Sequence, residues 1–221
     1  MINLCIDCGK DKSKKVEDKM AEAPKFKIFD LYDVSSIEVK DAALKPYMNL
    51  RPSLLLKSQG RRNQENLGAT KVNVVERIAN RLAVSGHVNK KHKIITNWSS
   101  GKYNRNMKTV LEVLALIEKR SKKNPVQVLV SAIENASPRD EITVIEQAGA
   151  RYPQAVDTSP IRRINLAIRW MIMGAYGKSF GKKNKIAQTL ANEIFLASEG
   201  NMESFAMGKK NEAEKQADSA R

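Results

Sequence analysis

The sequence predicts a mainly α-helical protein, a single helical domain of about six helices with a protruding β-hairpin arm. Apolar residues recur at helical spacing in several separate stretches of the chain. Residues that commonly begin or end helices flank most of these stretches. Only residues 141–157 instead place strand-type residues around a central turn, as a hairpin does. The 221 residues are 42% hydrophobic but only 5% aromatic, so we expect a sizeable, mostly aliphatic core.

The N-terminal part should be the least regular. Residues 1–24 are polar and rich in lysine, which predicts a disordered basic extension ahead of a helical domain spanning 25–221. Met20 precedes a plausible beginning of that domain and is a candidate alternative start. Residues 25–40 alternate apolar and polar side chains well enough for one or two short strands. Irregular connections are predicted around Pro46 and Pro52 and over residues 58–70.

Three amphipathic helices are predicted in the middle of the chain. The first two carry apolar stripes over residues 72–82 and 107–117, on either side of a polar loop over 86–103. A third helix follows after a short break. Helix starts are predicted at Thr70 and at Asn124-Pro125, and helix ends at Gly86 and at Ser137-Pro138.

The hairpin and three further helices follow. An isolated hairpin has little stability in water, so the arm either packs on the helices at its base or gains order from a partner. Ser159 and Pro160 suit the N-cap and first turn of a fourth helix. Its end is expected near Tyr176, at Gly174 and Gly177. A fifth helix is predicted over 186–195, stopped by Gly200, and a sixth, polar nearly all round, over 209–217.

The charge distribution indicates a polyanionic partner. The formal net charge is +15, which favours nucleic acid first and an anionic membrane surface second. Two stretches of 35 residues, 77–111 and 158–192, contain eight and seven Lys or Arg and no Asp or Glu. Chance would place about four acids in each, so both stretches point to dedicated surfaces. The chain has no apolar run long enough to span a membrane and only two cysteines, which favours a cytoplasmic protein.

The second acid-free stretch opens with the most informative segment, a helix start that carries Arg162 and Arg163. The helix dipole disfavours cations in a first turn, so another interaction should reward them there. Because backbone N–H groups also point outward from a first turn, two arginines beside them suit a phosphate. Apolar residues on one helical face, among them Ile161 and Ile168, would hold this helix to the core.

The segment RYPQAVDTSPIRRINLAIRW at 151–170 resembles the small-subunit ribosomal protein family numbered seven, in its archaeal and eukaryotic form. That family also places a hairpin strand before a helix start of this kind. The resemblance extends, in order and with no large gap, from Leu44 to Arg221. It is carried by LKPYMNL at 44–50, VNVVERIANRLAVSG at 72–86, KKNPVQVLVSAIENASPRDE at 122–141 and ESFAMGKKNEAEKQADSAR at 203–221.

The resemblance implies a structural protein of the small ribosomal subunit in the cytoplasm. It implies binding to the 3′ major domain of the small-subunit RNA, in the head of the subunit. It further implies neighbours such as ribosomal proteins nine and eleven, and a position close to the exit-site tRNA and the mRNA, with the hairpin reaching toward them. No cofactor and no catalytic role are expected.

Thirteen residues are candidate RNA contacts. The resemblance places the loop with Arg61 and Arg62, and the helix starts with Lys71 and Lys108, against RNA. On the hairpin's returning strand, Tyr152 either stacks on an unpaired base or packs as a half-buried sheet residue. The loop GKSFGKKNK lacks a Walker pattern but suits RNA phosphate. The full set is Arg61, Arg62, Lys71, Lys108, Arg151, Tyr152, Arg162, Arg163, Arg169, Lys178, Lys182, Lys183 and Lys185.

Three alternatives remain at this stage. A free RNA-binding regulator, for instance one that represses its own message, would use the same surface. A nuclease would need clustered acids for metal ions, which both basic stretches lack. Zinc binding by Cys5 and Cys8 with His87 and His92 is disfavoured, because nearly eighty residues separate the two halves. We therefore expect no metal site.

Overall fold

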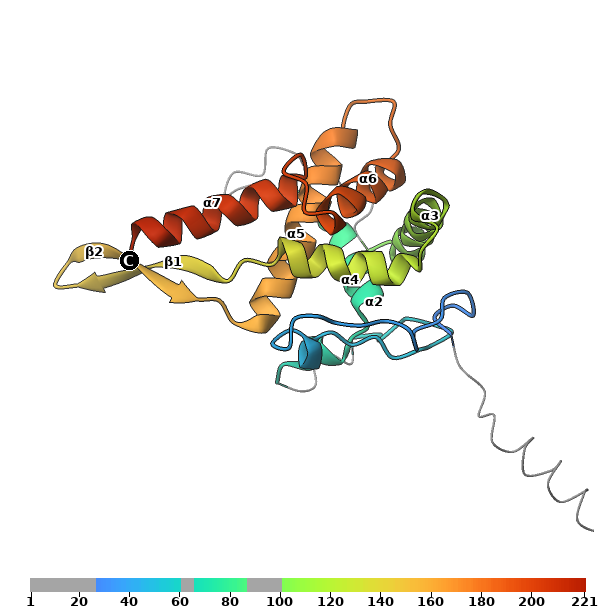
Figure 1. Ribbon diagram of the computed structural model, residues 1–221, viewed down its shortest axis with the longest axis horizontal. Helices are drawn as coiled ribbons and strands as arrows, with labels where there is room; N and C mark the ends of the chain where they lie inside the picture. Colours follow the sequence, from blue (N-terminus) through green and yellow to red (C-terminus); the bar gives the residue numbers. More distant parts are fainter. Residues whose placement is uncertain (1–26, 61–65, 87–100) are drawn as a thin grey trace, which may run out of the picture.

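The computed structural model describes residues 27–60, 66–86 and 101–221 (Figure 1). Within these ranges the chain forms six α-helices, one two-stranded antiparallel sheet and short 3₁₀ turns, so the predicted fold class is confirmed. The helices are α2 (Val74–Leu82), α3 (Tyr103–Ser121), α4 (Pro125–Ala136), α5 (Pro160–Ser179), α6 (Ile186–Ser198) and α7 (Phe205–Ser219). The strands are β1 (Asp140–Gln147) and β2 (Ala150–Asp157), and the 3₁₀ turns are η1 (Lys45–Tyr47) and η3 (Gly68–Lys71).

The core is aliphatic, as the composition predicts. Helix α6 packs against α3, α4 and α5, and α2 packs against α3 and α5. Each fully buried Leu or Ile contributes about 1.5–3 kcal/mol relative to an exposed side chain. The largest buried apolar side chains of the helices are Leu114, Ile117, Leu129, Ile133, Ile164, Met171, Ile172, Leu190 and Ile194.

Helix starts follow the predictions in part. Asn124 caps α4, since its side-chain oxygen accepts a hydrogen bond of 3.1 Å from the N–H of Val126. The predicted cap at Thr70 is wrong, because Thr70 lies in η3 and Asn73 caps α2 instead, with Oδ1 3.0 Å from the N of Val75. Ser159 holds the N-cap position of α5, but its side chain makes no capping hydrogen bond.

Helix α5 runs past its predicted end to Ser179 because Gly174 serves packing rather than termination. A Cβ on Gly174 would lie 2.6 Å from the Cβ of Phe205 and 2.9 Å from Oε1 of Glu193. The glycine therefore lets the start of α7 approach α5 closely. By contrast, a Cβ on Gly177 in the same helix would meet nothing within 4 Å.

Replacing Gly174 by alanine should therefore lower the free energy of unfolding by about 1–3 kcal/mol, because the added methyl overpacks the contact with α7. Gly177→Ala is the matched control and should raise stability by up to about 1 kcal/mol, since alanine favours an open helical position. Urea unfolding of the two variants checks this. Equal effects in the same direction would contradict the packing role of Gly174.

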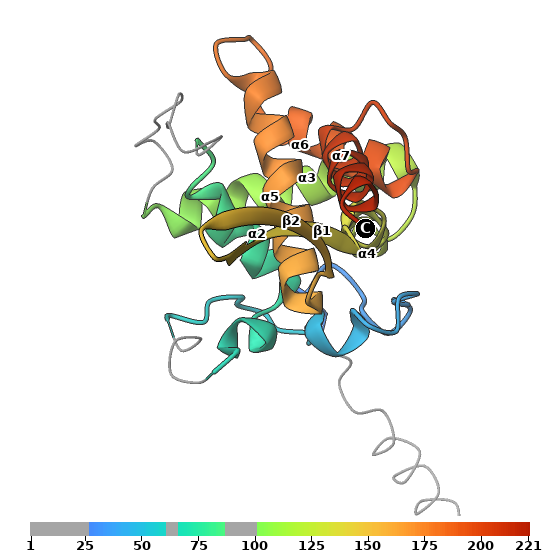
Figure 2. The ribbon, with the colours of Figure 1, turned by 90° about the vertical axis from the view of Figure 1, so that its left-hand side faces the viewer.

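The hairpin projects from the helices at one end of the molecule (Figures 1 and 2). Its register pairs Asp140 with Asp157 at the base and Gln147 with Ala150 at the turn, close to the predicted 141–157. The polar helix α7 docks along β1, as its composition requires. Arg221 forms an ion pair of 2.5 Å with Asp140, and Glu214 accepts a hydrogen bond from the N–H of Arg139 at 3.2 Å. The arm is thus packed at its base and extended beyond it.

The prediction of strands over 25–40 is wrong for the described part, 27–40, which holds only an isolated bridge between Ile28 and Tyr32. Residues 33–44, here called the strap, run along α4 instead. Their backbone groups bond to side chains of that helix rather than to a neighbouring strand, beginning with the amide of Asn124, which donates to the carbonyl of Asp33 at 2.6 Å. This satisfies the extended backbone without a sheet.

Candidate nucleic-acid interface

A groove of about 640 Å³ lies between α2 and the N-terminal half of α5. Arg77 and Arg81 line it from α2, and Arg162 and Arg169 line it from α5. None of the described residues that line the groove is an Asp or a Glu. We call this feature the arginine groove. It joins the two acid-free stretches of the sequence, since each contributes one wall.

Helical spacing brings the groove residues together. Arg81 lies one turn after Arg77 on α2, and Asn165 and Arg169 lie about one and two turns after Arg162 on α5. Both helices bury their opposite faces in the core, which points these polar side chains toward the groove. The amphipathic patterns thus align the cations.

Arg77 ties the two walls together. It is only 8% exposed, and its NH2 group donates to Oδ1 of Asn165 at 2.8 Å while NH1 donates to the carbonyl of Tyr47 at 3.3 Å. Burial lowers the pKa of Arg77 to about 10, so the guanidinium remains charged at neutral pH. Both acceptors are neutral, so neither cancels this charge.

Arg81 and Arg169 oppose each other electrostatically. Burial lowers the pKa of Arg81, and the positive charge of Arg169 lowers it further. Arg81 is half-buried and Arg169 is exposed, and holding their like charges together costs free energy, which an anion placed between them would recover. The groove is therefore suited to a negatively charged ligand such as a phosphate.

Arg162 is exposed and forms an ion pair with Glu141. Its Nε lies 2.5 Å from Oε2 of Glu141 on β1, and NH2 lies 3.4 Å from Oε1 of the same carboxylate. This pair connects the first turn of α5 to the base of the hairpin. An incoming phosphate would have to share Arg162 with Glu141 or displace that carboxylate.

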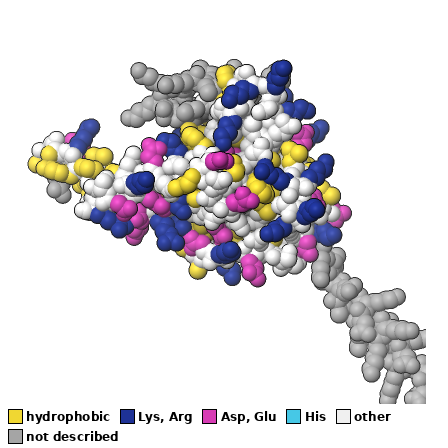
Figure 3. Space-filling model, turned by 45° about the horizontal axis from the view of Figure 1, so that its top comes forward, with side chains coloured by type: hydrophobic (Ala, Val, Ile, Leu, Met, Phe, Trp, Pro, Cys, Tyr) yellow, Lys and Arg dark blue, Asp and Glu magenta, His cyan; other side chains and the backbone are white. Residues whose placement is uncertain are grey.

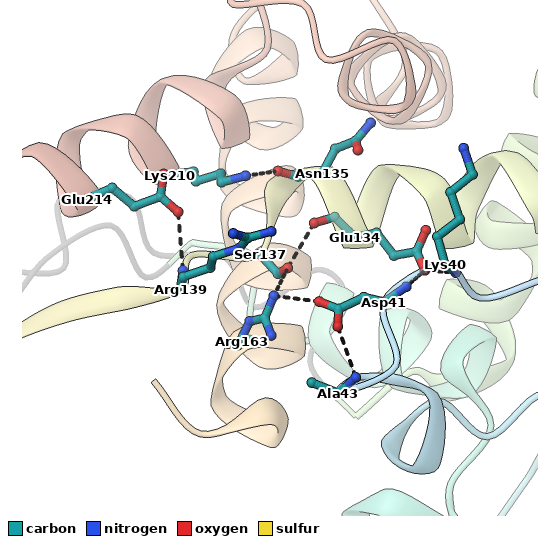
Figure 4. Close-up of polar contacts among 10 residues, drawn as sticks. All are labelled: Lys40, Asp41, Ala43, Glu134, Asn135, Ser137, Arg139, Arg163, Lys210 and Glu214. Carbon is teal, nitrogen blue, oxygen red and sulfur yellow. Dashed lines mark hydrogen bonds and ion pairs between the residues drawn. The ribbon is translucent and has the colours of Figure 1, made fainter. Parts of the chain in front are cut away.

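The neighbouring Arg163 has a different place. It is 8% exposed, its NH2 lies 2.7 Å from Oδ2 of Asp41, and it also contacts Oγ of Ser137 at 3.3 Å (Figure 4). The partner that stabilises this first-turn cation is the partly buried carboxylate of Asp41. The pair of arginines predicted to act together is thus divided between the surface and the interior.

The lysines in the last turn of α5 and in the loop after it divide in a similar way. Lys178 donates to Oε2 of Glu193 at 2.8 Å, and that carboxylate is fully buried, so Lys178 neutralises an internal charge. Lys182, Lys183 and Lys185 are exposed in the loop that leads to α6. These three are placed to meet a phosphate backbone.

The hairpin tip exposes apolar side chains beside one ion pair. Arg151 is exposed and lies 3.7 Å from Glu146, and Tyr152 is 57% exposed opposite Ile145. Val144 is 58% exposed on the other face of the ribbon. Hydrophobic side chains gather at the end of the arm, with a basic and an acidic side chain beside them, in the space-filling view (Figure 3). Tyr152 therefore lies where a stacking residue could act, rather than half-buried in a sheet.

The two remaining described candidates lie apart from the hairpin. Lys71 is exposed in η3 and lines a hollow of about 540 Å³ together with Arg51 and Thr70. Lys108 is exposed in the second turn of α3. Neither lines the arginine groove.

Comparison with known proteins identifies the family. Residues 54–221 match the model of the family described as ribosomal protein S7p/S5e. The chain belongs to this family. It is 45% identical over 197 residues to a protein of Nanoarchaeum equitans named small ribosomal subunit protein uS7, covering 89% of this chain and all of that protein. Proteins of the same name from Methanococcus maripaludis and Thermoplasma volcanium are 40% and 39% identical, over 88% of this chain and 98% and 100% of their own lengths.

The resemblance seen in the sequence is therefore confirmed as membership of the S7p/S5e family, with relatives from archaea. This is a family of structural ribosomal proteins rather than enzymes. The described residues contain no cluster of three or more His, Cys, Asp or Glu suited to a metal ion, and no helix among them is long and apolar enough to cross a membrane.

Several predicted residues lie outside the described part of this S7p/S5e chain. They are Arg61 and Arg62 of the candidate RNA contacts and Cys5, Cys8, His87 and His92 of the zinc alternative. The expected extension over 1–24 also lies outside it.

The sequence prediction missed Arg77 and Arg81 as groove residues. Both begin the first acid-free stretch, one turn apart on a helix with a clear apolar stripe. Two arginines one turn apart on an amphipathic helix would have indicated a basic helix face.

Proposed function

We propose that this ribosomal protein binds the 3′ major domain of the small-subunit RNA, in the head of the subunit, and that the arginine groove is its principal RNA site. Family membership gives the coarser role, a structural protein of the small ribosomal subunit. The finer role is supported by one observation above all. Arg81 and Arg169 face each other across a groove whose described lining contains no acid.

The remaining proposed contacts are distributed over several elements of the protein. Arg162 extends it toward the hairpin, and Lys182, Lys183 and Lys185 provide flexible cations beyond α5. Recognition by such side chains follows shape and phosphate position more than base edges. The proposed contacts also include Lys71, Lys108, Arg151 and Tyr152, with Arg61 and Arg62 retained from the sequence prediction. Arg163 and Lys178 are left out because each already forms an ion pair within the protein, Arg163 with Asp41 and Lys178 with Glu193.

The hairpin is proposed to reach toward the exit-site tRNA and the mRNA path. Its tip combines Arg151 with exposed apolar side chains, including Tyr152, which suits stacking on an unpaired base or contact with a neighbouring head protein. Ribosomal proteins nine and eleven are the proposed neighbours.

Binding of the full chain to a 3′ major domain fragment, compared with a fragment of another small-subunit domain of equal length, tests the proposal. We expect tighter binding to the 3′ major fragment, with the logarithm of the affinity falling linearly with the logarithm of the salt concentration. Equal affinity for both fragments would overturn the domain assignment. Sucrose-gradient fractionation of native material adds a second measurement, because a protein absent from small subunits would instead be a free RNA-binding regulator.

The ion pair between Arg162 and Glu141 leads to a further expectation. Glu141→Gln removes the carboxylate that competes with phosphate for Arg162, so affinity for the RNA fragment should rise about two- to fivefold, the range of an exposed ion pair. Fluorescence titration measures this. Glu212→Gln, which breaks the Lys209–Glu212 pair on α7, is the matched control and should leave affinity unchanged. Weaker binding by Glu141→Gln would mean that Arg162 does not contact RNA.

A further inference from the structure

Side chains of α4 hold the strap through hydrogen bonds to its backbone. The amide of Gln127 accepts from the N–H of Glu38 at 2.9 Å and donates to its carbonyl at 3.0 Å. One oxygen of Glu134 accepts from the N–H groups of Lys40 and Asp41, at 2.7 and 3.1 Å. Because these contacts use backbone atoms of the strap, the carboxylate of Asp41 is left to interact elsewhere.

Asp41 uses its side chain to reach α5. Its Oδ1 accepts from the N–H of Ala43 at 2.9 Å, and its Oδ2 pairs with Arg163 at 2.7 Å. Arg163 also contacts the hydroxyl of Ser137, which donates to the carbonyl of Glu134 at 2.8 Å (Figure 4). Arg163 is therefore the point where the strap, the end of α4 and the first turn of α5 meet.

This junction lies directly behind the arginine groove. Successive residues of a helix point about 100° apart, so Arg163 faces inward while Arg162 faces the groove. A rotation or shift of the first turn of α5 would displace Arg162, and with it the edge of the groove. The other ion pair of this turn, between Arg162 and Glu141, is largely exposed on the arginine side and restrains it weakly.

We propose that Arg163 is a positioning residue for RNA binding. Through Asp41 it locks the strap to the first turn of α5 and sets the orientation of the arginine groove, without itself contacting RNA. The strap thereby takes part in RNA recognition although it lies on the far side of that turn from the groove. This inference rests on the proposed RNA-binding function.

The salt dependence of binding distinguishes a residue that contacts phosphate from one that only positions other residues. Removing a phosphate contact lowers the slope of log affinity against log salt by about one, whereas misplacing the groove lowers affinity more evenly across salt. We expect Asp41→Asn and Arg163→Gln to weaken binding to the 3′ major domain fragment about three- to tenfold with an unchanged slope. Arg162→Ala should instead reduce the slope.

The Asp41→Asn variant should remain folded, because the amide oxygen of asparagine still accepts a hydrogen bond from Arg163. Its predicted structural signature is faster amide hydrogen exchange at Asp41, Ala43 and the first turn of α5. The exchanged pair Asp41→Arg with Arg163→Asp should recover affinity relative to either single charge change, since an acid is also favoured in a helix's first turn. Glu212→Gln on α7 serves as the control and should alter neither affinity nor slope.

The outcomes separate cleanly. A reduced salt slope for Arg163→Gln would show that Arg163 contacts phosphate and would overturn its positioning role. Unchanged affinity for a folded Asp41→Asn protein would overturn that role as well. If the unmodified protein does not prefer the 3′ major fragment, the proposed function itself is wrong, whatever the variants show. Loss of affinity at constant slope, with recovery in the exchanged pair, is the result expected.

Discussion

Replacing Arg81 and Arg169 together by alanine should weaken binding to the 3′ major domain fragment about ten- to hundredfold at physiological salt, and should lower the salt slope by about one, the value for one lost phosphate. The physical reason is the groove's own electrostatics. Each guanidinium raises the free energy of the other in the unbound protein, and a phosphate between them recovers that cost in addition to its direct contacts. Affinity measured at four or more salt concentrations gives both quantities.

The control for this double variant removes two lysines of α7, Lys209 and Lys215, which lowers the net charge equally but leaves the arginine groove intact. It should change affinity far less, because long-range charge is screened over about 8 Å at physiological salt. If both double variants weaken binding alike, net charge rather than the groove drives association. The two Arg81 and Arg169 single variants should not add independently, because removing one arginine also relieves the other.

Local signals predicted most of the helical fold. Asn124-Pro125 marks a helix start because a capping amide and a residue with preset φ stand side by side, and α4 begins there. The hairpin was predictable because a turn separates two runs of strand-type residues. The predicted end of α5 failed for a tertiary reason, since Gly174 is required by the approach of Phe205, 31 residues later.

The extended N-terminal segment shows a second limit of local signals. Alternation over 25–40 predicted strands because an extended backbone usually finds its hydrogen bonds in a sheet. In this protein the strap finds them on the side chains of α4, about 90 residues away in the sequence. Nothing in the alternation itself distinguishes these two ways of satisfying the backbone.

The candidate site was predictable in charge but not in detail. The two acid-free stretches contain the α2 and α5 walls of the arginine groove. Yet Arg162 and Arg163 are indistinguishable in the sequence, and only the position of Asp41, 122 residues from Arg163, decides which one is internal. Lys178 likewise belongs to Glu193 rather than to the exposed lysines that follow it.

Glu193 should be the most sensitive polar residue of the fold. Its carboxylate is fully buried and accepts hydrogen bonds from Lys178, from the hydroxyl of Ser204 at 3.3 Å and from the N–H of Phe205. The N–H of Phe205 belongs to the first turn of α7, where a negative charge is favoured by the helix dipole. One side chain of α6 therefore caps α7 and anchors α5.

Glu193→Ala should lower the free energy of unfolding by about 2–4 kcal/mol, because the Ser204 hydroxyl and the Phe205 N–H lose their acceptor in a poorly hydrated site. Urea unfolding measures this, with Gln188→Ala as the control, since Gln188 is exposed on the same helix and should change stability by less than about 0.5 kcal/mol. A similar, small effect for both would contradict the anchoring role of Glu193.

The same variant should also loosen the hairpin from a distance. Helix α7 is polar over most of its surface and buries only Ala206 and Ala217 fully, so it depends on its anchored ends. Its far end holds the arm through the Arg221–Asp140 pair. Amide exchange in β1 should therefore accelerate in Glu193→Ala more than in α3, which does not depend on α7. Equal acceleration in both elements would indicate global destabilisation instead of a specific loss of the support that α7 gives the hairpin.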